Sequence, residues 1–124
     1  MATKGQRGSQ KPAVRTINLE IGMPKVHEAL TRLDNELTTA RSQGYAIIKL
    51  IHGYGSSGVG GDIRTAVQRR LIELKEQEQI RTCIFGEDWS KSDEQTWKLL
   101  QAKPRLKDDQ DLGRKNPGIT IVVL

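Results

Sequence analysis

The sequence predicts an α/β domain, a two-layer βαβαββ arrangement in which helices cover a mixed four-stranded sheet. Apolar residues recur at spacings of three and four in segments 26–40 and 63–74, as in helices with one buried face. Segments 47–51 and 117–124 are almost wholly apolar, as in strands that are buried on both faces. Because strands and helices alternate along the chain, crossovers through the helices would place the first strands parallel.

The chain of 124 residues is long enough for one domain with a buried core. Its single cysteine, Cys83, excludes an internal disulfide and fits the reducing cytoplasm, and its position in a strand predicts an inert core residue. No apolar stretch approaches the roughly 18–20 residues that a membrane-spanning helix needs. We therefore expect a cytoplasmic protein with no membrane partner.

Positive charge is concentrated near the N-terminus of this chain, whose formal net charge is +5. Residues 1–15 carry four basic residues and no acidic one, whereas the rest carries 16 basic and 15 acidic residues. Residues 1–16 also lack hydrophobic periodicity, so we expect a disordered basic arm before a domain at 17–124. Such an arm either adds salt-dependent attraction to phosphates or is a solvated tail.

The regular elements follow in order. Residues 17–21 alternate apolar and polar side chains, which predicts a half-buried strand. Pro24 suits the start of the first helix, which should end at Gly44. The second helix should be capped by Asp62 and stabilised by an Arg69–Glu73 pair. Residues 80–85 read as a third strand.

Residues 86–116 form an insertion before the last strand. A capping box that begins at Ser92 predicts a short helix, which should stop before Pro104. Residues 103–115 are polar with mixed charge, so we expect a mobile segment there. Trp89 and Trp97 either pack the insertion against the sheet or stack on bases.

The chain is organised around the segment that follows the second strand. There His52 is followed by five glycines within nine positions, and then by a periodic helix. Glycines let the backbone approach another molecule closely, and a helix N-terminus presents free N–H groups and a positive dipole end. The segment therefore predicts a cradle for an anion such as a phosphate, with the imidazole of His52 at its mouth.

Several ionisable residues are candidates for chemistry beside this cradle. His52 either exchanges protons, binds a phosphate or ends the strand as a hydrogen-bonded structural residue. Glu20 should share its sheet edge if the first two strands are parallel, either as an acid/base partner or as an exposed glutamate. His27 is expected to be a solvated surface residue. Arg64, with Arg69 and Arg70, either contacts phosphates or is ordinary surface charge.

The spacing Gly53-x-Gly55-x-x-Gly58 matches a dinucleotide fingerprint, but its surroundings argue against that function. The last glycine precedes the helix, and the chain is too short for two mononucleotide-binding halves. Val59 and Gly60 stand where a P-loop needs lysine and serine or threonine. We expect no dinucleotide cofactor.

The sequence resembles the Smr (small MutS-related) domain family over residues 17–85 and 117–124. Residues 51–55 look like the family's H-G-x-G signature, and residues 118–124 look like its final strand. Residues 19–30 align with the opening strand and helix, where the family usually reads L-D-L-H-G.

The resemblance implies a fold like the C-terminal domain of the third bacterial initiation factor. It also implies binding of DNA or RNA, with nicking or endonuclease activity in several members that is associated with the D-x-H motif and the H-G-x-G loop. In this chain Glu20 replaces the aspartate of D-x-H and Gly22 replaces its histidine. Hydrolysis that needs this histidine should be weak or absent, unless His27 substitutes for it.

Three hypotheses follow. The first is a nucleic-acid-binding domain whose contacts come from the loop and the helix behind it: Gly53, Tyr54, Gly55, Ser56, Ser57, Gly58 and Arg64. The second is an endonuclease with Glu20 and His52 as catalytic residues, which would bring in Mg²⁺ or Mn²⁺; no cofactor is expected otherwise. The third is a scaffold that binds another protein through the insertion. The sequence does not choose between DNA and RNA.

Overall fold

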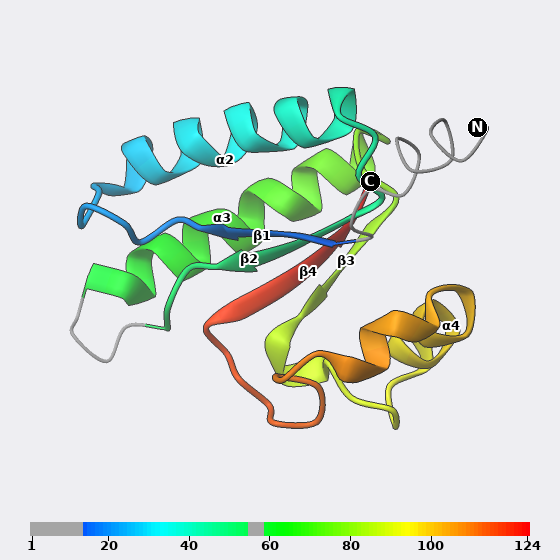
Figure 1. Ribbon diagram of the computed structural model, residues 1–124. Coiled ribbons are helices and arrows are strands. Elements are labelled where there is room, and N and C mark those ends of the chain that lie inside the picture. The colour runs from blue at the N-terminus through cyan, green and yellow to red at the C-terminus, as the bar shows by residue number, and fades with distance from the viewer. Residues whose placement is uncertain (1–13, 55–58) are drawn as a thin grey trace, which may run out of the picture.

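The computed structural model describes residues 14–54 and 59–124, and it confirms the predicted α/β class with a mixed four-stranded sheet. Figure 1 shows the elements. They are, in chain order, β1 (Val14–Asn18), α2 (Val26–Ser42), β2 (Ile47–Ile51), α3 (Val59–Glu76), β3 (Thr82–Phe85), η1 (Gly86–Asp88), α4 (Glu94–Ala102), η2 (Pro104–Asp108) and β4 (Ile119–Val123).

The strands lie in the order β1-β2-β4-β3. β1 and β2 are parallel, as predicted, with Asn18 opposite Ile51. β4 runs antiparallel to both of its neighbours, so β3 has the direction of β1 and β2. The carboxyl ends of β1 and β2 therefore lie side by side, which is where open α/β sheets usually carry their binding sites.

Helices α2 and α3 cover one face of the sheet, which we call the helix face (Figure 1). Leu33 and Leu37 of α2 and Val67 and Leu71 of α3 are buried there against alternate residues of the strands, such as Leu50. The periodicity of three and four in the sequence is what gives each helix this continuous apolar stripe.

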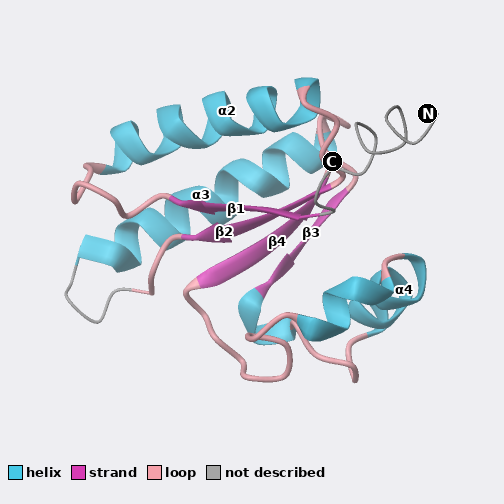
Figure 2. Ribbon diagram, in the orientation of Figure 1, coloured by secondary structure: helices cyan, strands magenta, loops and turns pink. Residues whose placement is uncertain are grey.

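The insertion covers the opposite face, which we call the insertion face; Figure 2 shows its helices and loops below the sheet. The buried residues there are Trp89, Leu100 and Leu106 of the insertion, which pack against Ile47 of β2 and against Ile119 and Ile121 of β4. The short helix ends before Pro104 as predicted, although its N-cap is Asp93, which accepts the N–H of Thr96 at 2.9 Å.

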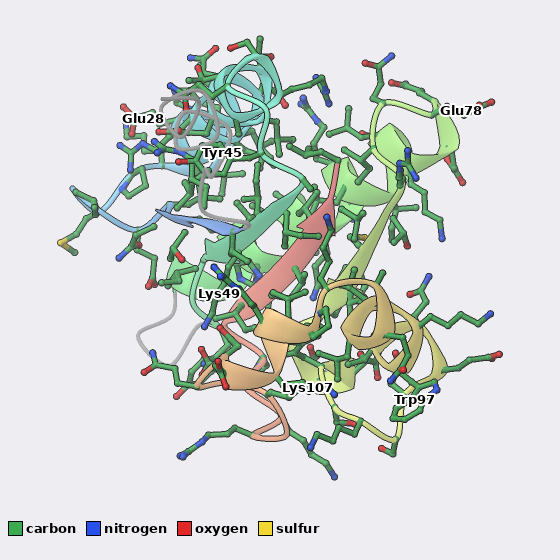
Figure 3. The ribbon with its side chains drawn as sticks, turned by 45° about the vertical axis from the view of Figure 1, so that its right-hand side comes forward. Glu28, Tyr45, Lys49, Glu78, Trp97 and Lys107 are labelled. Carbon is green, nitrogen blue, oxygen red and sulfur yellow. The ribbon has the colours of Figure 1, made fainter. Side chains whose placement is uncertain are left out.

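The expectation of a mobile segment at 103–115 is wrong. Lys49 of β2 is 5% exposed and forms ion pairs with Asp109 at 2.8 Å and Asp111 at 2.6 Å. The indole N–H of Trp89 donates to Asp109 at 3.0 Å. Figure 3 shows Lys49 between the sheet and the insertion. A buried lysine and the two aspartates thus fix this polar segment to the sheet.

Three predicted boundaries and pairs need correction. β1 begins at Val14, so residues 14–16 belong to the sheet and not to the arm; residues 1–13 lie outside the described residues. α3 begins at Val59, so Asp62 stands in the first turn and is not the cap. Arg70, not Arg69, pairs with Glu73, at 3.8 Å, and also with Asp34 at 2.6 Å.

No helix within the described part of the chain is both long and apolar enough to cross a membrane.

Candidate functional site

We call the carboxyl ends of β1 and β2, with residues 19–25 and 52–54 that follow them, the carboxyl edge. The N–H of Leu19 donates to the carbonyl of Ile51 at 2.8 Å, which continues the pairing of the two strands. The carboxylate of Glu20 lies directly over Gly53, because a Cβ atom added at Gly53 would collide with Glu20 Oε2. The structure therefore brings Glu20 together with the start of the glycine loop.

The imidazole of His52 does not stand at the mouth of the loop. His52 is fully buried, 0% exposed, on the helix face of the sheet. Its Nδ1 lies 2.8 Å from the carbonyl oxygen of Gly53, and its Nε2 lies 2.9 Å from Thr120 Oγ1. A carbonyl only accepts hydrogen bonds, so Nδ1 carries the proton and Nε2 accepts the threonine hydroxyl. Both ring nitrogens are thus occupied within the protein.

The electrostatic surroundings keep this ring neutral. Burial lowers the pKa of His52 below its ordinary value near 6.5, and the positive charge of Arg64 lowers it further. The hydrogen bond to Gly53 and the charge of Glu87 raise the pKa, but they do not overcome the loss of hydration. A neutral, buried imidazole therefore links the backbone of Gly53 to Thr120 of β4.

The backbone at the start of the loop is also fixed from within. The N–H groups of His52 and Gly53 both donate to the carbonyl of Gly118, at 2.9 and 3.1 Å. Gly53 has φ of 74°, a conformation that side chains rarely adopt. Tyr54 rests on Gly118 and is 54% exposed. The predicted cradle therefore does not use the N–H of Gly53.

The rest of the predicted cradle lies in the loop and in the first turn of α3. Gly55, Ser56, Ser57 and Gly58 are outside the described residues. α3 begins at Val59, where the first N–H groups of a helix have no intrahelical acceptor. In α2, by contrast, the side chain of Glu28 already accepts the N–H of Lys25 at 2.7 Å. The N-terminus of α3 stays the place at which the sequence predicts an external anion.

The charged candidates differ in their surroundings. Arg64 forms an ion pair with Glu87, so it ties α3 to η1 at the end of β3. His27 is exposed in the first turn of α2, as predicted. Cys83 is half-buried in β3, and burial raises the pKa of its thiol, as expected for an unreactive cysteine.

The metal that a nuclease would need does not fit the described residues. In residues 14–54 and 59–124, no group of three or more His, Cys, Asp or Glu side chains gathers in a way that could hold a metal ion. Glu20 contributes one carboxylate at Gly53, while both nitrogens of His52 are taken.

Comparison with known proteins identifies the fold. The crystal structure of the Smr domain of Thermus thermophilus MutS2 superimposes with a TM-score of 0.55 and 23% sequence identity. The match covers 89% of this chain and 96% of that domain. The chain has the Smr-domain fold. The resemblance to the Smr domain that the sequence predicts is therefore confirmed for the fold.

Comparisons of sequence alone are less extensive. No family model matches the chain. A stretch of 55 residues, 44% of this chain, is 36% identical to the small ribosomal subunit protein uS9 of Rhodococcus opacus (strain B4). The match spans 32% of uS9, about a third of its length. It says nothing of the Smr-like fold as a whole.

Thr120 and Gly118 position the start of the candidate site, and sequence reasoning missed both. Thr120 donates to His52, and Gly118 accepts both N–H groups at the start of the loop. The available signal was a lone hydroxyl in an otherwise apolar strand, because a buried hydroxyl requires a hydrogen-bond partner. That partner could not be identified without the pairing of β4 with β2.

Proposed function

We propose that this Smr-like domain binds nucleic acid at the carboxyl edge and at the N-terminus of α3, through the backbone, without efficient hydrolysis. One observation carries the proposal: a glycine loop leads into the N-terminus of an 18-residue helix, beside an exposed Tyr54. The amide groups there suit phosphate oxygens, and the exposed ring suits a sugar or base. The fold shared with the Smr domain of MutS2 supports the proposal.

The chemistry of the edge argues for binding without cleavage. Gly22 stands where the resemblance requires a histidine, and it has φ of 84° in a turn. His52 is buried with both nitrogens bonded, so it would have to leave Thr120 and Gly53 to move a proton. We propose that His52 is a positioning residue that holds the loop, and that Glu20 is the exposed acidic group of the edge.

Glu20 itself gives a sharp test of this proposal. Its carboxylate faces the start of the loop, so it should repel a phosphate bound nearby. Glu20→Gln should therefore raise the affinity for single-stranded RNA and DNA by about threefold, since one like charge close to a bound phosphate is removed. If Glu20 were instead a catalytic or metal-binding residue, the wild-type protein would cleave plasmid or structured RNA in Mg²⁺ or Mn²⁺, and Glu20→Gln would lose that cleavage.

The binding measurement is fluorescence anisotropy with labelled single-stranded and duplex DNA and RNA at low and moderate salt. We expect affinity that falls as salt rises, because phosphate contacts release counterions. A triple variant, Lys4→Ala, Arg7→Ala and Lys11→Ala, removes arm charge and should weaken binding without abolishing it. Absence of binding at low salt would reject the proposal, and binding lost entirely in the triple variant would assign it to the arm.

A scaffold function is the second candidate, and one observation favours it. Trp97 is 51% exposed on the outer side of α4, and Figure 3 shows it pointing away from the sheet. Exposed tryptophans are frequent anchors of protein interfaces. Because the insertion packs against the sheet, its deletion would disturb the fold, and Trp97→Ala is the better variant. If the domain is a scaffold, Trp97→Ala should lose binding of a protein partner while its affinity for nucleic acid stays unchanged.

A further inference from the structure

The hydrogen bonds of β4 show which residues of that strand face each neighbouring strand. Just before β4, the carbonyl of Gly118 accepts the N–H of His52 from the β2 side at 2.9 Å. At the end of β4, the carbonyl of Val123 accepts the N–H of Arg81 from the β3 side at 2.8 Å. Because the direction of the backbone groups alternates along a strand, the odd-numbered residues of β4 face β3.

β3 therefore carries outward-facing backbone groups. Thr82 and Ile84 lie opposite odd-numbered residues of β4, so their N–H and C=O groups point to β4. The N–H and C=O groups of Cys83 and Phe85 point the other way, toward the outer side of the strand. Among the described strands β3 pairs only with β4, so this outer side is an edge of the sheet. Cys83 and Phe85 each present a donor and an acceptor there.

A groove lies between this edge and α3. Its volume is about 400 Å³, and it is lined by Ile72, Lys75, Glu76, Cys83 and Phe85. Three of the five lining residues are apolar, and the two others carry opposite charges. Ile72 is 45% exposed, although it is a large aliphatic side chain. An extended strand that paired with β3 would cover this apolar surface as well as the open backbone groups.

The opposite edge of the sheet, β1, is protected against such pairing. Its second residue is Arg15, whose guanidinium pairs with Glu36 at 3.3 Å and lies 6.0 Å from the centroid of the Tyr45 ring. Charged side chains within an edge strand disfavour pairing with another chain. β3 reads Thr-Cys-Ile-Phe and contains no charged residue. The two edges therefore differ, and β3 is the one suited to accept a further strand.

We propose that β3 pairs with β3 of a second copy of this chain, antiparallel and about a two-fold axis. Cys83 lies opposite Phe85 of the second copy, and Ile84 lies at the axis. In this register both outward-facing residues of each copy donate and accept hydrogen bonds across the axis. The two grooves also meet there, so Ile72 and Phe85 of each copy cover the apolar surface of the other. The sheets of the two copies become continuous.

The charges that flank β3 favour a second copy over an unrelated strand. Counting outward from the axis in this register, Arg81 lies opposite Glu87 of the second copy, and the symmetry forms this pair twice. Opposite charges in facing positions of two strands attract. Arg81 is exposed, and the side chain of Glu87 is 42% exposed beside Arg64. A two-fold interface requires a self-complementary surface, and the backbone groups, apolar side chains and charges of β3 all meet this requirement.

Sedimentation equilibrium of the full chain, from micromolar to millimolar concentration and without nucleic acid, tests the proposal. The wild type should show a dimer fraction that rises with concentration, as expected for a small interface. Ile72→Lys brings like charges together beside the axis and should raise the dissociation constant of the dimer by about tenfold or more. Ile21→Lys is the matched control, because Ile21 is 65% exposed beyond β1, and it should keep the wild-type constant.

A cross-link tests the register. Phe85→Cys places a thiol opposite Cys83 of the second copy, with Cα atoms about 5.5 Å apart, which is within reach of a disulfide. Oxidation with copper–phenanthroline should convert this variant to a covalent dimer on a non-reducing gel, and adding Ile72→Lys should abolish the product. In the wild type the two Cys83 residues lie diagonally, about 7–8 Å apart, and should cross-link poorly.

Three results would overturn the proposal. They are a wild type that stays monomeric at every concentration, a dimer that Ile72→Lys leaves unchanged, and a Phe85→Cys variant that cross-links no better than the wild type. A dimer of the second kind would belong to another surface, and one of the third kind would not use the antiparallel pairing of β3. Because self-association is measured without nucleic acid, none of these results bears on the proposed function.

Discussion

The two faces of the sheet are stabilised in different ways. The helix face is a continuous apolar layer, in which His52 and Thr120 form a neutral buried hydrogen bond at the carboxyl edge. The insertion face has a smaller apolar cluster, and its polar segment is attached by the charges of Lys49, Asp109 and Asp111. Burial alone would lower the pKa of Lys49, but the two aspartates raise it above its ordinary value.

This difference indicates what each face needs from its buried polar groups. On the helix face the hydrophobic layer forms without buried polar groups, and the hydrogen bonds of His52 fix only the end of β2 against β4. On the insertion face the charges decide whether residues 103–115 stay on the sheet, because an uncompensated buried charge is strongly unfavourable. Substitutions in the His52–Thr120 bond and in the Lys49 ion pairs should therefore lower stability by different amounts and in different regions of the protein.

Lys49→Met gives the largest expected effect. It leaves Asp109 and Asp111 partly buried without their cation, which should reduce the free energy of unfolding by about 3–5 kcal/mol. Urea denaturation measures the loss. Hydrogen exchange should accelerate in residues 103–115 before it does in α2.

A variant without charges at these three positions distinguishes the contribution of the ion pairs from that of side-chain packing. Lys49→Met combined with Asp109→Asn and Asp111→Asn should recover much of the lost stability, since no unpaired charge remains. Equal stability of wild type and the single Lys49→Met variant would contradict the view that these charges attach the insertion.

Thr120→Val is expected to have a smaller effect, confined to the carboxyl edge. It removes the hydroxyl that donates to His52 Nε2 and leaves a buried acceptor unsatisfied, which costs about 1–3 kcal/mol. Urea denaturation measures the loss of stability. The control is Thr31→Val, because the exposed hydroxyl of Thr31 donates only to the carbonyl of His27 in its own helix. If both variants lose the same stability, the His52–Thr120 bond has no special structural role.

The smallest expected effect is a dependence of stability on pH. The folded pKa of His52 lies below its ordinary value near 6.5, so the unfolded chain binds the proton first as pH falls. The contribution is complete above about pH 6.5 and is lost as pH falls through the folded pKa. His52→Gln should flatten the profile of stability against pH between neutral pH and about pH 5. Identical profiles of wild type and His52→Gln would contradict a lowered pKa of His52 in the folded protein.

Much of the fold was predictable because hydrophobic patterns record burial. The two helices, the parallel first strands and the meeting of Glu20 with the glycine loop follow from periodicity and element order. The ionic attachment of residues 103–115 was not predictable, because a lysine within an apolar strand and aspartates 60 and 62 residues away carry no local signal of pairing. The inward orientation of His52 likewise depends on Thr120, which only the register of β4 brings near.

The central claim is that nucleic acid binds at the carboxyl edge. The most direct test is an NMR titration of the isotope-labelled protein with a short single-stranded oligonucleotide, followed through backbone amide shifts. The account predicts that the largest changes occur at residues 20–24, at Tyr54 and in the first turn of α3. Changes confined to residues 86–116 or to the N-terminal arm would contradict it.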